Sequence, residues 1–89
     1  MPSRTVEVRN KRGLHARASA KFVTLASQID AEIAVEKDGT IVCGTSIMGL
    51  MMLGAAQGDS ITISATGLGA ERAVEELSAL VEALFNEAE

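Results

Sequence analysis

The hydrophobic residues of this chain change their spacing several times along the sequence, and these changes limit the possible folds more than any other feature. Alternation at every second position is typical of a half-buried strand, whereas recurrence at every third or fourth position is typical of an amphipathic helix. Alternation, together with the hairpin signal Asp38-Gly39, predicts strands over residues 4–9, 31–37, 40–43 and 60–66. Helical spacing predicts helices within residues 14–29, over residues 47–53 and from residue 70 to about 86.

The order of these elements, β-α-β-β-α-β-α, predicts an α+β fold. We expect an open-faced β-sandwich, in which one four-stranded antiparallel sheet carries three helices on one face. The 89 residues suffice for one domain over residues 1–89. With 47% hydrophobic residues the chain can close a single core, but it is too small to enclose a deep substrate cavity.

Composition argues against several classes of site. The single Cys43 excludes an internal disulfide and is interpreted as a small buried hydrophobe in a reducing compartment. One cysteine and one histidine argue against a metal site, and we expect no metal and no cofactor.

An uncharged run covers residues 39–58, but its five glycines and polar residues argue against a membrane-spanning helix. We therefore expect a soluble, cytoplasmic protein without a signal peptide.

The stretch Gly13-Leu14-His15-Ala16-Arg17 joins a basic segment to the first predicted helix, and His15 is the only histidine of the chain. The first backbone N–H groups of a helix form an anion site. The imidazole is a nucleophile near neutral pH, and Arg17 offers a planar set of donors that suits phosphate oxygens. This arrangement favours phosphoryl transfer onto His15. The alternative is that His15 is a partial helix cap or a solvated side chain.

The charges of the chain are distributed unevenly. Residues 1–28 contain six basic residues and one acidic residue, whereas residues 70–89 contain one basic and six acidic residues. The positive charge therefore surrounds His15. It suits either an acidic protein partner or a phosphate, although a solvated basic face is an equally simple explanation.

The short helix predicted over residues 47–53 has two faces, with Ser46 placed to cap its start. One face holds Leu50 and Leu53. The other holds what we call the apolar patch, made of Ile47, Met48, Met51 and Met52. Either all six side chains are core, or the apolar patch is exposed and docks partners. Basic residues that would flank an exposed patch are Arg12, Arg17 and Lys21.

Two motifs resemble the signatures of HPr, the histidine-containing phosphocarrier family of the bacterial phosphoenolpyruvate-dependent phosphotransferase system. The first is Gly13-Leu14-His15-Ala16-Arg17, and the second is the stretch TSIMGLMMLGAA over residues 45–56. The resemblance implies that His15 accepts a phosphoryl group on Nδ1 from Enzyme I and passes it to IIA-type proteins. It further implies that Ser46 is a regulatory site for a serine kinase or phosphorylase. The chain would then be a phosphoryl carrier and not an enzyme, and we expect a monomer.

One position departs from the family pattern, because Ala18 stands where the family usually has proline. Alanine is a good helix former, so the fold should survive, and only the rigidity of the loop-to-helix junction is in question. His15 excludes the catabolite-repression paralogue that lacks the histidine. The nitrogen-related branch of the system uses a similar carrier and stays open.

Two other function classes compete with the phosphocarrier. A regulatory module could use the same fold to bind a protein partner, with the apolar patch and Ser46 but without His15 chemistry. A nucleic-acid-binding domain is disfavoured, since the chain has no Tyr or Trp for base stacking and is acidic in total.

Overall fold

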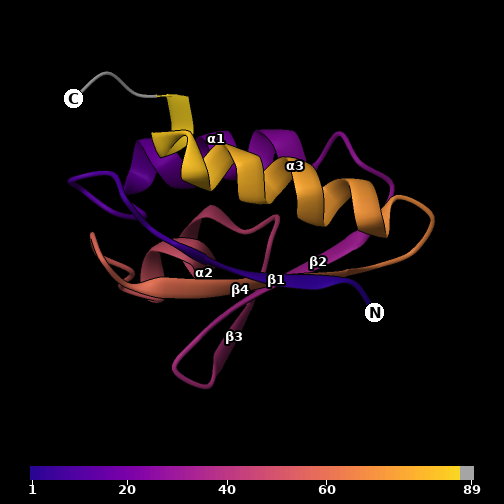
Figure 1. The fold of residues 1–89 in the computed structure, drawn as a ribbon, viewed down its shortest axis with the longest axis horizontal. Coiled ribbons are helices and arrows are strands. Elements are labelled where there is room, and N and C mark those ends of the chain that lie inside the picture. Colours follow the sequence, from indigo (N-terminus) through magenta and orange to yellow (C-terminus); the bar gives the residue numbers. More distant parts are fainter. Residues whose placement is uncertain (87–89) are drawn as a thin grey trace.

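The computed structural model describes residues 1–86, and its strands form one antiparallel sheet. The strands are β1 (Ser3–Glu7), β2 (Glu32–Lys37), β3 (Thr40–Cys43) and β4 (Ser60–Thr66). The helices are α1 (Ala16–Ala26), α2 (Ile47–Met52) and α3 (Ala70–Glu82), followed by the 3₁₀ turn η1 (Leu84–Asn86). The strand order across the sheet is β1-β4-β2-β3, and Figure 1 shows α1 and α3 on one side of the sheet. The predicted α+β fold is confirmed.

Alternation in the strands places the core between the sheet and the helices. In β4, Ile61, Ile63 and Ala65 are buried, and β4 pairs with both β1 and β2. α3 packs against β4 and β1, while α2 packs against α1 and β3. β1 ends at Glu7, two residues before the predicted end, because the chain turns there to pair with the loop that precedes β4.

The prediction for Cys43 was wrong, because this side chain is exposed. β3 is an edge strand whose half-buried Val42 packs against the core, so the next residue faces away from it. The Sγ atom of Cys43 lies 3.1 Å from the Thr45 hydroxyl. The hydrogen bond from Thr45 lowers the pKa of the Cys43 thiol below its usual value.

The last helix is shorter than predicted. It ends at Glu82, and the next turn, η1, has positive φ angles at Leu84, Phe85 and Asn86, namely 59°, 55° and 58°. This left-handed turn buries Phe85 completely. The ammonium group of Lys21 on α1 donates to the Phe85 carbonyl at 3.0 Å and so ties α1 to the turn.

The uncharged run over residues 39–58 contains β3, α2 and their loops. Within residues 1–86, no helix has both the length and the hydrophobicity needed to cross a membrane.

Candidate functional site

His15 occupies the N-cap position of α1, and its ring turns toward the first turn of the helix. Its backbone is extended (φ −76°, ψ −179°), and its carbonyl accepts the first helical hydrogen bond from Ser19. The ring atom Nδ1 accepts a hydrogen bond from the backbone N–H of Arg17 at 3.2 Å. Because Nδ1 is an acceptor, the neutral ring that makes this bond carries its proton on Nε2. The side chain is half-buried, so Nδ1 sits at the positive end of α1 without being enclosed.

The loop before His15 is a tight turn built on Gly13, which has φ +65°. The N–H of Gly13 donates to the carbonyl of Asn10 at 3.1 Å, and the carbonyl of Gly13 accepts from the N–H of His15 at 2.9 Å. The same Gly13 carbonyl accepts a second hydrogen bond from the Asn10 side-chain amide at 2.7 Å. These bonds set the direction from which the chain enters α1.

A second loop, residues 54–59, braces this turn from the side. The N–H of Leu14 donates to the carbonyl of Ala55 at 2.9 Å. The Gln57 side-chain amide donates to the carbonyl of Arg9 at 3.0 Å. The loop that follows α2 therefore holds both ends of the segment that leads into His15.

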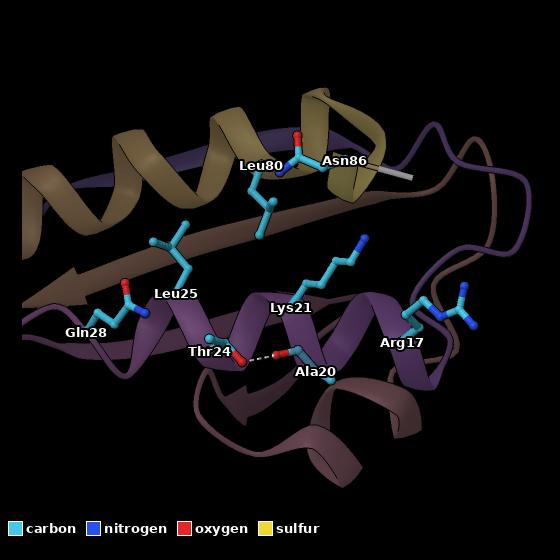
Figure 2. Close-up of a pocket in the computed structure, with 8 residues that line it drawn as sticks. All are labelled: Arg17, Ala20, Lys21, Thr24, Leu25, Gln28, Leu80 and Asn86. Carbon is cyan, nitrogen blue, oxygen red and sulfur yellow. Dashed lines mark hydrogen bonds between the residues drawn. The ribbon is translucent and has the colours of Figure 1, made fainter. Parts of the chain in front are cut away.

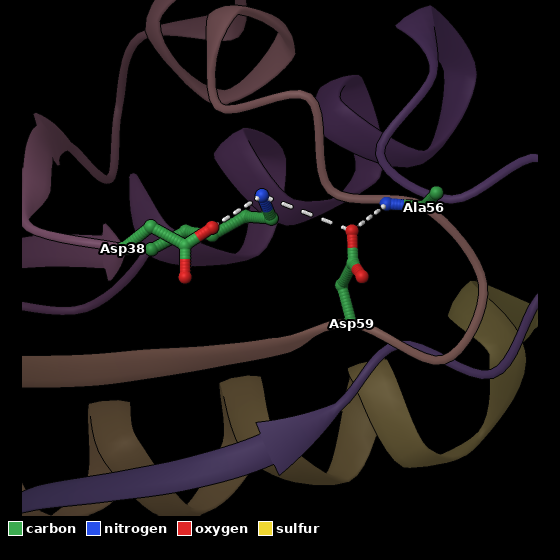
Figure 3. Close-up of polar contacts among 4 residues, drawn as sticks. Asp38, Ala56 and Asp59 are labelled. Atoms are coloured by element: carbon green, nitrogen blue, oxygen red, sulfur yellow. Dashed lines mark hydrogen bonds and ion pairs between the residues drawn. The ribbon is translucent and has the colours of Figure 1, made fainter.

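Asp59 in turn shapes the bracing loop, as Figure 3 shows. Its Oδ2 atom accepts a hydrogen bond from the N–H of Ala56 at 3.0 Å and lies 3.8 Å from the ammonium of Lys37. Lys37 also donates to Asp38 at 2.9 Å. The hydrogen bond to Asp38 raises the pKa of Lys37 above its usual value, and the charge of Asp59 adds to this effect.

The basic residues predicted around His15 do not all have the same environment. Arg17 is the second residue of α1 and is exposed, with its side chain at the site end of a groove of about 450 Å³ between α1 and the end of α3 (Figure 2). Arg12 is exposed in the loop before Gly13. Lys21 is half-buried and contacts the Phe85 carbonyl, so it contributes to packing, and its role in docking stays a prediction.

The two faces of α2 differ as one of the two interpretations predicted. Leu50 and Leu53 are buried in the core. The exposed fractions of the apolar patch are 40% for Ile47, 73% for Met48, 44% for Met51 and 79% for Met52. The alternative that all six side chains are core is wrong. α2 packs against α1, so the helix that carries the apolar patch lies beside the helix that begins directly after His15.

Ser46 is the N-cap of α2, with its hydroxyl accepting from the N–H of Gly49 at 3.0 Å. Ala18 is fully buried within α1, and the helix still begins at Ala16 without the usual proline. The departure from the family pattern therefore leaves the helix start in place.

The comparisons with known proteins agree with this geometry. A family model described as "PTS HPr component phosphorylation site" matches residues 2–83. The chain belongs to the HPr family. It is 45% identical over 89 residues to the phosphocarrier protein HPr of Neisseria meningitidis serogroup A, with 100% of both chains covered. It is also 42% identical over 85 residues to the phosphocarrier protein NPr of Shewanella violacea, covering 96% of this chain and 93% of that protein.

A solved structure supports the same assignment. The structure of HPr-C-His from Thermoanaerobacter tengcongensis superimposes with a TM-score of 0.94 at 45% identity, covering 100% of both chains. Membership of the family makes the chain a phosphocarrier component of the phosphotransferase system that carries a phosphohistidine, and not an enzyme. The relatives of this chain thus include both an HPr and an NPr phosphocarrier.

Proposed function

We propose that this chain accepts a phosphoryl group on Nδ1 of His15 from Enzyme I, with phosphoenolpyruvate as the ultimate donor, and passes it to IIA-type proteins. The observation that carries the proposal is the orientation of Nδ1 toward the N-terminus of α1 in the only histidine of the chain. We further propose that the carrier acts as a monomer in the cytoplasm.

The proposed transfer needs no group beyond those of the site and the donor. The lone pair of Nδ1 forms the new N–P bond while the bond from phosphorus to the donor breaks, and the proton on Nε2 stays on the ring. The N–H of Arg17 then donates to a phosphate oxygen in place of Nδ1. A helix N-terminus stabilises such a charge by about 0.3–2 kcal/mol, which orients the group without trapping it.

Mass spectrometry tests the function directly. After incubation with phosphoenolpyruvate and Enzyme I, the chain should gain about 80 Da, the mass of one phosphoryl group. The gain should disappear in acid, as expected for a phosphohistidine. When an IIA-type protein is added, the phosphorylated chain should transfer its phosphoryl group to that protein and lose the added mass. A chain that gains no mass, with an active Enzyme I, contradicts the proposal.

The branch of the system can be tested with the same readout. The similarity to NPr is the observation that favours an alternative, a carrier or regulatory binding module of the nitrogen-related branch. Enzyme I proteins of the sugar branch and of the nitrogen branch would be compared as donors at equal concentration. The faster donor identifies the branch.

Arg17 should speed phosphoryl transfer by donating to the oxygens that gain charge. We expect Arg17→Ala to slow acceptance about 10- to 100-fold, which corresponds to the loss of one charge-assisted hydrogen bond. The side chain is exposed, so thermal unfolding should not change. Stopped-flow phosphorylation by Enzyme I measures the rate. The control is Arg72→Ala on α3, and equal rates for the two variants would remove Arg17 from the mechanism.

The apolar patch should form the centre of the docking surface, because Met side chains adapt to more than one partner. We expect Met48→Asp to weaken Enzyme I binding by at least about tenfold, since it places a charge in the centre of the contact. Isothermal titration measures the Kd. Leu68→Asp is the matched control, because Leu68 is 96% exposed in the loop before α3. A comparable loss of affinity in the control would show that Enzyme I binding does not depend on the apolar patch in particular.

Phosphorylation of Ser46 by a serine kinase should inhibit docking without unfolding the chain. We expect Ser46→Asp to lower the Enzyme I reaction rate several-fold, because the new charge lies at the edge of the apolar patch, within about one Debye length of an acidic partner. Ser46→Asn keeps a capping side chain without the charge and should react at the normal rate. Equal rates for all three proteins would contradict the switch.

A further inference from the structure

We propose that Asn10 is a positioning residue for the phosphoryl acceptor, which it holds through the carbonyl of Gly13. The inference rests on the proposed function, because it names a residue that acts on the geometry of His15. Asn10 is fully buried although its side chain is polar. It lies five residues before His15, in the turn that leads into α1.

A continuous series of hydrogen bonds links Asn10 to the backbone and the ring of His15. The main-chain carbonyl of Asn10 accepts from the N–H of Gly13 at 3.1 Å, and its side-chain Nδ2 donates back to the carbonyl of Gly13 at 2.7 Å. That carbonyl also accepts from the N–H of His15 at 2.9 Å. The backbone of His15 is thereby held in the N-cap conformation from which Nδ1 meets the N–H of Arg17.

The oxygen atom of the Asn10 amide, Oδ1, indicates the role of the side chain. Within residues 1–86, Oδ1 of Asn10 has no hydrogen-bond partner, although it is buried. A buried acceptor without a donor is unfavourable for stability. An apolar residue would avoid this cost but could not donate to Gly13. The side chain therefore serves as a donor to one carbonyl, and that carbonyl is the one that fixes His15.

The expected consequence concerns the reaction and not the docking. Without the Asn10 amide, the Gly13 carbonyl keeps one of its two donors, and the entry of the chain into α1 becomes less defined. A reacting atom displaced by a fraction of an ångström loses its aligned geometry, which lowers the rate of the chemical step. The apolar patch lies on α2, outside this turn, so partner affinity should stay the same.

The experiment compares Asn10→Ala with the unaltered chain and with Ile63→Val. The second variant removes one methylene from the core at β4 and lowers stability without touching the turn. We expect Asn10→Ala to lower kcat for phosphorylation by Enzyme I about tenfold while KM stays within about twofold. Ile63→Val should leave both constants unchanged. A normal kcat for Asn10→Ala, an equal fall in Ile63→Val, or a change confined to KM would overturn the proposal.

A second measurement does not depend on phosphoryl transfer. Nitrogen-15 spectra of the unphosphorylated chain report the hydrogen bond at Nδ1 of His15 and the amide proton of Arg17. In Asn10→Ala both signals should move toward the values of an unbonded imidazole and a free amide, whereas Ile63→Val should leave them in place. If the unaltered chain took up no phosphate, the proposed function would fail, and these spectra would still decide the role of Asn10. Unchanged spectra in Asn10→Ala would overturn that role.

Discussion

The His15→Ala variant takes up no phosphoryl group from Enzyme I and phosphoenolpyruvate while it remains folded; this is the largest effect that we expect. His15 is the only histidine, so its removal leaves the chain without an imidazole. The structural loss is the N-cap hydrogen bond from Arg17, worth about 0.5–2 kcal/mol. This is a small part of the stability of about 5–15 kcal/mol that is typical of a domain.

Intact-mass measurement after incubation with the donor checks this result, and circular dichroism checks the fold. His15→Asn is a useful second variant, because asparagine is a strong N-cap residue and cannot form a phosphohistidine. Both variants should fail to gain mass, and His15→Asn should unfold at a temperature at least as high as His15→Ala. A mass gain in either variant would place the acceptor elsewhere in the chain.

The Gly13→Ala variant should lose about 2–6 kcal/mol of unfolding free energy, the second large effect. Gly13 has φ +65°, which costs a residue with a Cβ about 1–3 kcal/mol. A Cβ at this position would also press on the Ala55 carbonyl oxygen and would lie 2.9 Å from the Cα of Ala56. Both are backbone atoms that cannot rotate away, so the loops must separate, at a further cost of about 1–3 kcal/mol.

Gly54→Ala separates these two contributions. Gly54 also has φ +65°, but among the described residues a Cβ there would meet no heavy atom within 4 Å. Urea unfolding should therefore show that Gly54→Ala loses only the conformational part. Gly13→Ala should in addition slow phosphoryl acceptance, since the hydrogen bond from Leu14 to Ala55 would be broken. Equal losses of stability in the two variants would mean that the contact between the loops carries no energy.

The elements that depend on side-chain periodicity could be predicted from the sequence. Ile61, Ile63 and Ala65 alternate in β4, and the two faces of α2 follow from the spacing of Leu50 and Leu53. The same reasoning placed His15 and Ser46 at helix starts, where the structure has them as N-caps. These predictions succeed because burial of one face leaves a regular mark on the order of apolar residues.

Other features left no such mark. Phe85 continues the apolar stripe of α3, yet it reaches the core through a left-handed turn and not through a continued helix. The hydrogen bond between Leu14 and Ala55 joins two backbone groups, so no pair of side chains in the sequence predicts it. Asn10 looks like an ordinary turn residue in a polar segment, and only its complete burial reveals its contact with Gly13. Long-range backbone contacts of this kind require the fold to be known first.

The hydrogen bond between Nδ1 of His15 and the N–H of Arg17 has a consequence for the direction of the relay. In the proposed transfer, this amide donates to Nδ1 before the phosphate arrives and to a phosphate oxygen afterwards, so loading exchanges one acceptor for another. The hydrogen bond of this amide then favours neither the empty nor the loaded chain strongly. We therefore expect it to oppose transfer in neither direction, so that the supply of donor and the demand of acceptor set the net flow.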